Sequence, residues 1–234
     1  MTFSPTARRP PPATAESVAQ PQSGVAATNG IDPTLQRAIS AIALPGLLIG
    51  HRLISPGDED ALLEEETASI ASSVIRARRA SGAARIVARQ LLARLGHDRC
   101  SLPRGASGEP IWPAGIAGSL AHDDRIAVAA VGKQAKVRAV GIDIEPADAL
   151  PSDMLALIAT PRELGRIADD PLRGRLLFAA KEAVYKALYP LDRVFLEFHE
   201  IEVDLAGRTA MTRTGRVVAL QFCISSHVLV LASG

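Results

Sequence analysis

The stretch that decides the fold is Gly141-Ile142-Asp143-Ile144-Glu145-Pro146. Alternate side chains of a strand share a face, so Ile142 and Ile144 are predicted to point into a core. Asp143 and Glu145 then lie on the opposite face, about 7 Å apart along the strand, and the closing proline ends it. Two such carboxylates suit one Mg²⁺ ion, which prefers oxygen ligands and binds together with substrate phosphates. The alternative is a half-exposed strand with solvated acids.

Downstream, residues 176–188 carry the strongest helical pattern of the chain. Leu177, Ala180, Val184 and Leu188 form one apolar stripe at helical spacing. Glu182 and Lys186 are neighbours on another face, at i and i+4. They form either an ordinary stabilising surface pair or part of a site. In a site, Glu182 is a third metal carboxylate and Lys186 contacts a phosphate as a point charge.

Upstream, Gly118-Ser119-Leu120-Ala121-His122 precedes the strand that contains the two acids. His122 either donates a hydrogen bond to a phosphate or is a loop histidine with a backbone partner. The other histidines lack the spacing of zinc ligands, so no zinc site is expected. A helical stretch further upstream is rich in arginine, whose guanidinium fork suits phosphate oxygens. The alternative is a solvated basic face, and the residues concerned are Arg76, Arg78, Arg79, Arg85, Arg89 and Arg94.

The surrounding pattern predicts an α+β fold of two similar α/β lobes. Residues 1–35 are rich in Pro, Ala, Ser and Thr and are expected to form a disordered tail. Residues 36–138 are the predicted N-terminal lobe, and residues 139–234 the C-terminal lobe with the metal site. The predicted strands are one or two within 39–53, then 118–121, 126–131, 137–144, 201–205, 217–224 and 228–231. The predicted helices are two within 62–95, with a break near Ser81-Gly82, then 154–158, 161–167 and 176–188.

Composition excludes several classes of protein. The net charge of +1 over 234 residues favours neither a nucleic-acid partner nor a membrane surface. Cys100 and Cys223 are too few for a secreted disulfide scaffold. No window approaches the roughly 18 apolar residues of a membrane span. A cytoplasmic protein with reduced thiols is expected.

Taken in order, these motifs resemble the larger, single-chain 4'-phosphopantetheinyl transferases of the surfactin and enterobactin synthase type. The family pattern is an arginine-rich helix, then G-x-P-x-W-P, G-S-[IL]-[ST]-H, G-I-D-x-E and F-x-A-K-E-[AS]-x-[YF]-K. The matching segments are Gly108–Pro113, Gly118–His122, Gly141–Glu145 and Phe178–Lys186. Trp112-Pro113 and Tyr189-Pro190 favour the branch that contains enterobactin synthase component D.

The resemblance implies transfer of 4'-phosphopantetheine from coenzyme A to a serine of an apo acyl or peptidyl carrier domain. The products are the holo carrier and 3',5'-ADP, in siderophore, non-ribosomal peptide or polyketide synthesis. Asp143, Glu145 and Glu182 would hold Mg²⁺, and Glu182 and Lys186 would be catalytic. The residues implied to bind coenzyme A are Arg78, Arg85, Arg104, His122, Lys181 and Lys186. The implied assembly is a pseudo-dimeric monomer.

The sequence departs from this pattern at three places. Ala121 replaces the usual Ser or Thr, Asp123 replaces a frequent Cys, and Arg79 is not followed by the expected acidic and aromatic residues. The metal carboxylates are untouched by these departures. Two alternatives stay open, a non-catalytic coenzyme A-binding protein and another magnesium-dependent phosphate-transfer enzyme.

Overall fold

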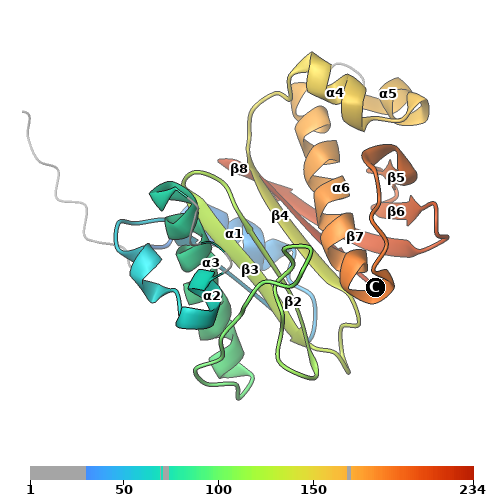
Figure 1. Ribbon diagram of the computed structural model, residues 1–234. Helices are drawn as coiled ribbons and strands as arrows, with labels where there is room; N and C mark the ends of the chain where they lie inside the picture. The colour runs from blue at the N-terminus through green and yellow to red at the C-terminus, as the bar shows by residue number, and fades with distance from the viewer. Residues whose placement is uncertain (1–29, 69, 71–73, 168–169) are drawn as a thin grey trace, which may run out of the picture.

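The computed structural model describes residues 30–68, 70, 74–167 and 170–234, and Figure 1 shows their arrangement as two units side by side. Most of the predicted tail, residues 1–29, lies outside the described residues. Within residues 30–35, the prediction of disorder is wrong, because α1 (Pro33–Ala41) begins there. Asp32 caps this helix by accepting hydrogen bonds from the N–H groups of Thr34 and Leu35.

The N-terminal unit is a three-stranded antiparallel sheet covered by one long helix. Its strands are β1 (Leu47–Leu53), β2 (Ile116–His122) and β3 (Ile126–Lys133), in the order β1-β3-β2. Helix α3 (Ile75–Arg94) packs on this sheet and on the short helix η1 (Asp58–Ala61). The short helix α2 (Glu64–Ala68) precedes it.

Two boundary predictions in this unit are wrong. Residues 39–41 belong to α1, so only one strand lies within 39–53. The expected break at Ser81-Gly82 is absent, and α3 continues through both residues. Gly82 is present because the helix touches η1 there: a Cβ on Gly82 would lie 1.9 Å from the Asp58 carbonyl oxygen.

The C-terminal unit is a five-stranded antiparallel sheet in the order β4-β8-β7-β6-β5. The strands are β4 (Val140–Pro146), β5 (Ile201–Asp204), β6 (Thr209–Thr212), β7 (Val217–Ile224) and β8 (His227–Ser233). Helix α6 (Pro171–Asp192) packs on β4 and β8. The helices α4 (Ser152–Ile158) and α5 (Pro161–Ile167) and the short η2 (Phe198–Glu200) complete it. The strand β6 was not predicted from the sequence.

Strand β4 lies unusually close to α6. A Cβ on Gly141 would lie 1.9 Å from the Ala183 carbonyl oxygen and 2.6 Å from the Ala187 nitrogen. Only glycine permits this approach. The glycine of the opening motif therefore sets the spacing between the strand that carries Asp143 and the helix that carries Glu182.

The two sheets share one core, because β2 packs against β4. One buried cluster contains Ile126 and Val128 of β3, Ile142 and Ile144 of β4, and Leu229 of β8. The predicted α+β fold of two lobes is thus confirmed, each lobe being an antiparallel sheet with one long helix on it. The predicted boundary at residues 138 and 139 falls in the connection between β3 and β4 and stays a prediction.

None of the helices in the described part of the chain is long and apolar enough to cross a membrane.

Candidate active site

A cavity of about 380 Å³ lies between the two units. Helix α3, strand β2, helix α6 and the loop between α3 and β2 all contribute to its walls. Several side chains from the sequence motifs line it: Arg85, Arg104, Trp112, His122, Glu182, Tyr185, Lys186 and Tyr189. Residues far apart in the sequence are therefore brought to one cavity.

Trp112 closes one side of the cavity by packing on Gly118. A Cβ on Gly118 would lie 2.5 Å from the indole ring, so the glycine of the histidine motif makes room for the tryptophan. The Tyr189 hydroxyl donates a hydrogen bond to the Ser107 hydroxyl, and Arg193 forms an ion pair with Glu109. These contacts attach the loop between α3 and β2 to the end of α6.

The three predicted metal carboxylates come from β4 and the helix facing it. Asp143 is 5% exposed, and its Oδ1 accepts a hydrogen bond from Lys186 Nζ at 2.6 Å. The Oε2 of Glu145 accepts one from Arg175 Nη1 at 3.0 Å. Arg175, Glu182 and Lys186 are spaced at i, i+7 and i+11 on α6, so one helix face presents them to β4.

The pKa values show that this carboxylate group is electrostatically unfavourable by itself. Burial raises the pKa of Asp143 above its usual value, against the opposing effect of Lys186. Burial also raises the pKa of Glu145, and the charge of Asp143 raises it further. The same two causes raise the pKa of Glu182, with Lys186 opposing them. A buried Asp143 beside two half-buried acids that it repels favours additional positive charge at this place.

The donor set fits a hard divalent cation. The buried Oδ2 of Asp143 has no hydrogen-bond partner, although a buried carboxylate oxygen normally has one. In the described residues, no three acidic, histidine or cysteine side chains are already gathered around one point. Lys186 and Arg175 instead neutralise Asp143 and Glu145, so the carboxylates must reorient slightly for a shared cation.

The cavity lining also contains several basic side chains. Burial lowers the pKa of His122, and the charges of Lys186 and Arg104 lower it further. Burial likewise lowers the pKa of Arg85, with Arg104 and Arg89 acting in the same direction. Glu66 opposes this effect on the pKa of Arg85, and Lys186 is paired with Asp143. Arg85, Arg104, His122 and Lys186 therefore suit the phosphates of a ligand.

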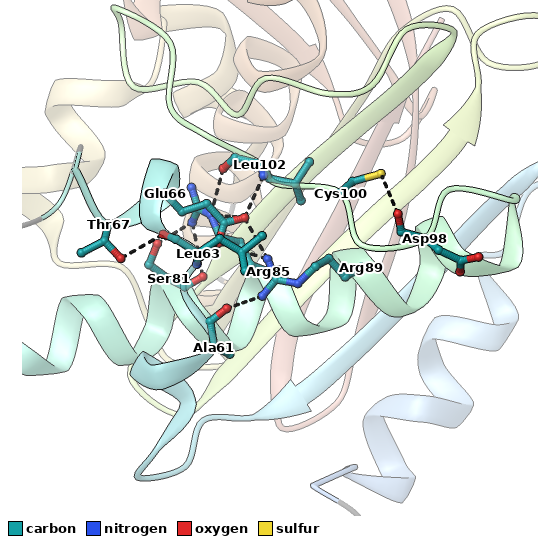
Figure 2. A network of polar contacts seen from close by, with 10 residues as sticks. All are labelled: Ala61, Leu63, Glu66, Thr67, Ser81, Arg85, Arg89, Asp98, Cys100 and Leu102. Atoms are coloured by element: carbon teal, nitrogen blue, oxygen red, sulfur yellow. Dashed lines mark hydrogen bonds and ion pairs between the residues drawn. The ribbon is translucent and has the colours of Figure 1, made fainter.

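Arg85 is held in place by the polar network of Figure 2. Its Nε donates to the Leu102 carbonyl at 2.9 Å and its Nη1 to the Ser81 hydroxyl at 2.5 Å. The fully buried Glu66 lies 3.7 Å from the guanidinium and also accepts hydrogen bonds from Arg89 and the Leu102 N–H. This network fixes the loop after α3 and the arginine that lines the cavity.

The structure places some predicted residues elsewhere. Lys181 is fully buried and does not line the cavity; its Nζ donates to Glu163 at 2.7 Å and to the Ile158 and Phe198 carbonyls at 2.8 Å each. This contradicts the expected contact of Lys181 with coenzyme A. Arg78 also lies outside the cavity lining, and its Nε is buried without a partner. Arg76 and Arg79 form ion pairs with Asp124 and Glu59.

Sequence analysis missed the contact of Arg175 with Glu145, one of the three predicted metal carboxylates. Its spacing from Glu182, seven residues and therefore two helical turns, was the available signal. The pairing also depends on the turn after β4, because Arg175 donates to the Asp148 and Ala149 carbonyls at 3.3 and 3.4 Å. No local sequence pattern predicts such contacts.

Comparison with known proteins gives consistent matches. The 4'-phosphopantetheinyl transferase N-terminal domain model matches residues 64–132, and the 4'-phosphopantetheinyl transferase superfamily model matches residues 139–232. The 4'-phosphopantetheinyl transferase Npt of Nocardia iowensis is 43% identical over 57% of this chain and 62% of its own length. The 4'-phosphopantetheinyl transferase Svp of Streptomyces mobaraensis is 38% identical over 70% of each chain. Enterobactin synthase component D of Escherichia coli K12 is 34% identical over 63% of this chain and 72% of its own. The matched segments thus span about three fifths to seven tenths of these relatives.

Proposed function

Since the chain belongs to the 4'-phosphopantetheinyl transferase superfamily, we propose that it transfers the phosphopantetheine arm of coenzyme A to a serine of an apo carrier protein, with Mg²⁺ as cofactor. The products are the holo carrier and 3',5'-ADP. The observation that carries this proposal is the cavity whose lining contains Glu182 and Lys186, because Lys186 in turn holds Asp143, which does not itself line the cavity.

Asp143, Glu145 and Glu182 are the residues that would hold Mg²⁺. When bound, the ion would offset negative charge on the phosphoryl oxygens of coenzyme A. The unpartnered Oδ2 of Asp143 supports this assignment, as do the raised pKa values of all three acids. A cation in this place removes the repulsion that the protein alone leaves partly uncompensated.

The chain's own residues supply positioning and charge. Lys186 contacts the pyrophosphate and stabilises the charge on the departing 3',5'-ADP. Arg85, Arg104 and His122 hold the 3'-phosphate and adenine end. These groups keep the β-phosphorus in line with the attacking serine oxygen.

Glu182 accepts the proton of the carrier serine, directly or through a water molecule. Its raised pKa suits this task, because a base is most effective when its pKa approaches the working pH. Glu182 also lines the cavity, so its carboxylate is accessible to a hydroxyl that enters there.

The carrier is an acyl or peptidyl carrier domain, with siderophore, non-ribosomal peptide or polyketide synthesis as the pathway class. The similarity to enterobactin synthase component D supports carriers of this kind. We further propose that the enzyme works as a pseudo-dimeric monomer in the cytoplasm, since both units that form the cavity come from one chain.

Release of 3',5'-ADP distinguishes this function from its alternatives. Purified protein is mixed with coenzyme A, Mg²⁺ and an apo carrier, and the nucleotide is measured by chromatography. We expect release that needs the carrier serine and stops with EDTA. Coenzyme A binding without release in the presence of several carriers would indicate a non-catalytic binding protein. Release without any carrier would indicate another phosphate-transfer enzyme.

A further inference from the structure

We propose that Asp123 and His227 form a positioning pair, which joins the strand carrying His122 to the sheet carrying the metal carboxylates and thereby sets the affinity for the 3'-phosphate of coenzyme A. This inference rests on the proposed function, in which His122 contacts that phosphate.

The pair is a buried contact between the two units. His227 Nε2 lies 2.8 Å from Asp123 Oδ2, and the two side chains are 4% and 8% exposed. Asp123 follows directly after β2 in the N-terminal unit, and His227 begins β8 in the C-terminal unit. In the ladder between β4 and β8, His227 pairs with Pro146, the residue next to Glu145. The contact therefore joins the neighbour of His122 to a residue paired with the neighbour of Glu145, one of the proposed metal carboxylates.

Asp123 also determines the turn that follows His122. Its Oδ1 accepts hydrogen bonds from the N–H groups of Arg125 at 2.7 Å and Ile126 at 2.6 Å. Burial alone would raise the pKa of Asp123, but the hydrogen bond with His227 and these two N–H donors hold it below the usual value. The carboxylate is thus an ionised acceptor with both oxygens in use, and its place is fixed by both units.

His227 is oriented from its other side as well. Its Nδ1 lies 3.0 Å from the Ser226 hydroxyl, and its own carbonyl accepts a hydrogen bond from the Ser225 N–H at 2.9 Å. A ring with hydrogen-bond partners at both nitrogens has little freedom to turn. The pair therefore joins two turns, each of which is also held by its own local hydrogen bonds.

A second contact attaches β2 to the C-terminal unit on the other side of His122. The Ile142 N–H donates to the Ser119 hydroxyl at 3.0 Å, within the motifs that contain His122 and Asp143. His122 thus lies between two residues, Ser119 and Asp123, that are both hydrogen-bonded to the C-terminal unit. Its own side chain lines the cavity. The position of its imidazole consequently depends on the backbone at both sides, which such supporting contacts must hold.

This pairing needs an acid at position 123, where the family pattern often has cysteine. A thiol is a weak acceptor and cannot bind His227 and two backbone N–H groups at once. The pair is therefore a property of this chain that the shared motifs do not require.

The test compares binding of coenzyme A and of 3'-dephospho-coenzyme A by calorimetry in the presence of Mg²⁺. The variants are His227→Leu, which removes the pair, and His227→Gln, whose amide still donates to Asp123. His122→Ala is the reference for loss of the phosphate contact. Asp124→Asn is the matched control, because Asp124 is adjacent but exposed and forms an ion pair with the exposed Arg76. The ratio of the two affinities does not depend on the fraction of folded protein.

We expect His227→Leu to weaken coenzyme A binding by about 10- to 100-fold, the usual range for a misplaced binding group. Binding of the 3'-dephospho analogue should stay near that of the unaltered protein, so the ratio approaches that of His122→Ala. His227→Gln should restore most of the ratio, and Asp124→Asn should leave it unchanged. An unchanged ratio in His227→Leu, or an equal loss for both ligands, would overturn the inference while His122→Ala still reports on the phosphate contact. Failure of the unaltered protein to bind coenzyme A would overturn the proposed function itself.

Discussion

At the scale of single residues, the candidate site is a group of acids whose ionised forms are disfavoured by their surroundings in the folded protein. Burial raises the pKa of all three acids, and the charge of Asp143 raises the pKa of Glu145 and Glu182 further. Protein stability is often lower where a site is arranged for binding rather than for folding. The negative charge of these carboxylates can be tested by substitution and by pH.

The first concerns Glu182→Gln. Turnover should fall by at least about 100-fold, the usual contribution of a catalytic base, while the dissociation constant for coenzyme A changes far less. The thermal midpoint of the metal-free protein should rise, because an unfavourable buried charge has been removed. Steady-state rates, calorimetric binding and thermal unfolding measure the three effects. Turnover equal to that of the unaltered protein would exclude Glu182 as the base.

The second concerns pH. A carboxyl group whose pKa is raised in the folded protein stabilises the fold below its unfolded pKa, and this contribution is lost as pH rises through the folded pKa. Stability of the metal-free protein should therefore decline as these groups ionise. Mg²⁺ binds only the ionised acids, so the gain in thermal midpoint from Mg²⁺ should grow between about pH 5 and about pH 8. An equal gain at both pH values would contradict the assigned metal carboxylates.

At the scale of elements, the close packing of β4 on α6 brings the acids together. Sequence patterning predicted the strand, its buried face and the helix, because Ile142, Ile144 and the apolar stripe from Leu177 to Leu188 follow the two periodicities. It could not predict how closely the two elements approach. That distance depends on the contact between Gly141 and the backbone of Ala183. The two residues lie far apart in the sequence, so no local pattern reports their contact.

Gly141→Ala tests this packing. The added methyl group would meet the α6 backbone, so we expect a loss of about 1–3 kcal/mol in the free energy of unfolding together with weaker Mg²⁺ binding. Gly165→Ala is the matched control, since a Cβ there meets nothing within 4 Å. Urea unfolding measures both variants. Equal stabilities would show that β4 and α6 do not pack as described.

Helical periodicity predicts that Lys181 faces the core, although the family resemblance implied a contact with coenzyme A. It lies four residues after Leu177 and three before Val184, and so falls on the buried stripe. Its ammonium group pairs there with Glu163, which also accepts hydrogen bonds from the Thr160 and Val203 N–H groups. The lysine therefore connects α6 with α4, α5 and η2, and Glu163 extends the connection to β5.

Lys181→Met should accordingly affect stability and not binding. Breaking a buried ion pair by removing one partner typically costs about 3–5 kcal/mol, which denaturant unfolding would detect. The folded fraction should bind coenzyme A with unchanged affinity. A selective loss of coenzyme A affinity in a stable variant would restore the ligand contact expected from the sequence.

At the scale of the whole molecule, the cavity exists only because the two units share a core. The motif order indicated the family and its α+β fold, since each motif has a fixed place in the chain. The pattern missed α1 and β6, which are short, and it could not locate contacts such as Asp123 with His227, whose partners come from different sheets. Contacts between units are set by the packing of whole sheets, which periodicity within one segment does not describe.

The central claim is that these two units together form a magnesium-dependent phosphopantetheinyl transferase. The most direct test is the intact mass of an apo carrier protein after incubation with coenzyme A, Mg²⁺ and either the unaltered enzyme or Glu182→Gln. The account predicts that the unaltered enzyme adds one phosphopantetheine to the carrier, that EDTA prevents the addition, and that Glu182→Gln slows it strongly. A carrier mass that stays unchanged with the unaltered enzyme, or that increases equally in the presence of EDTA, would contradict it.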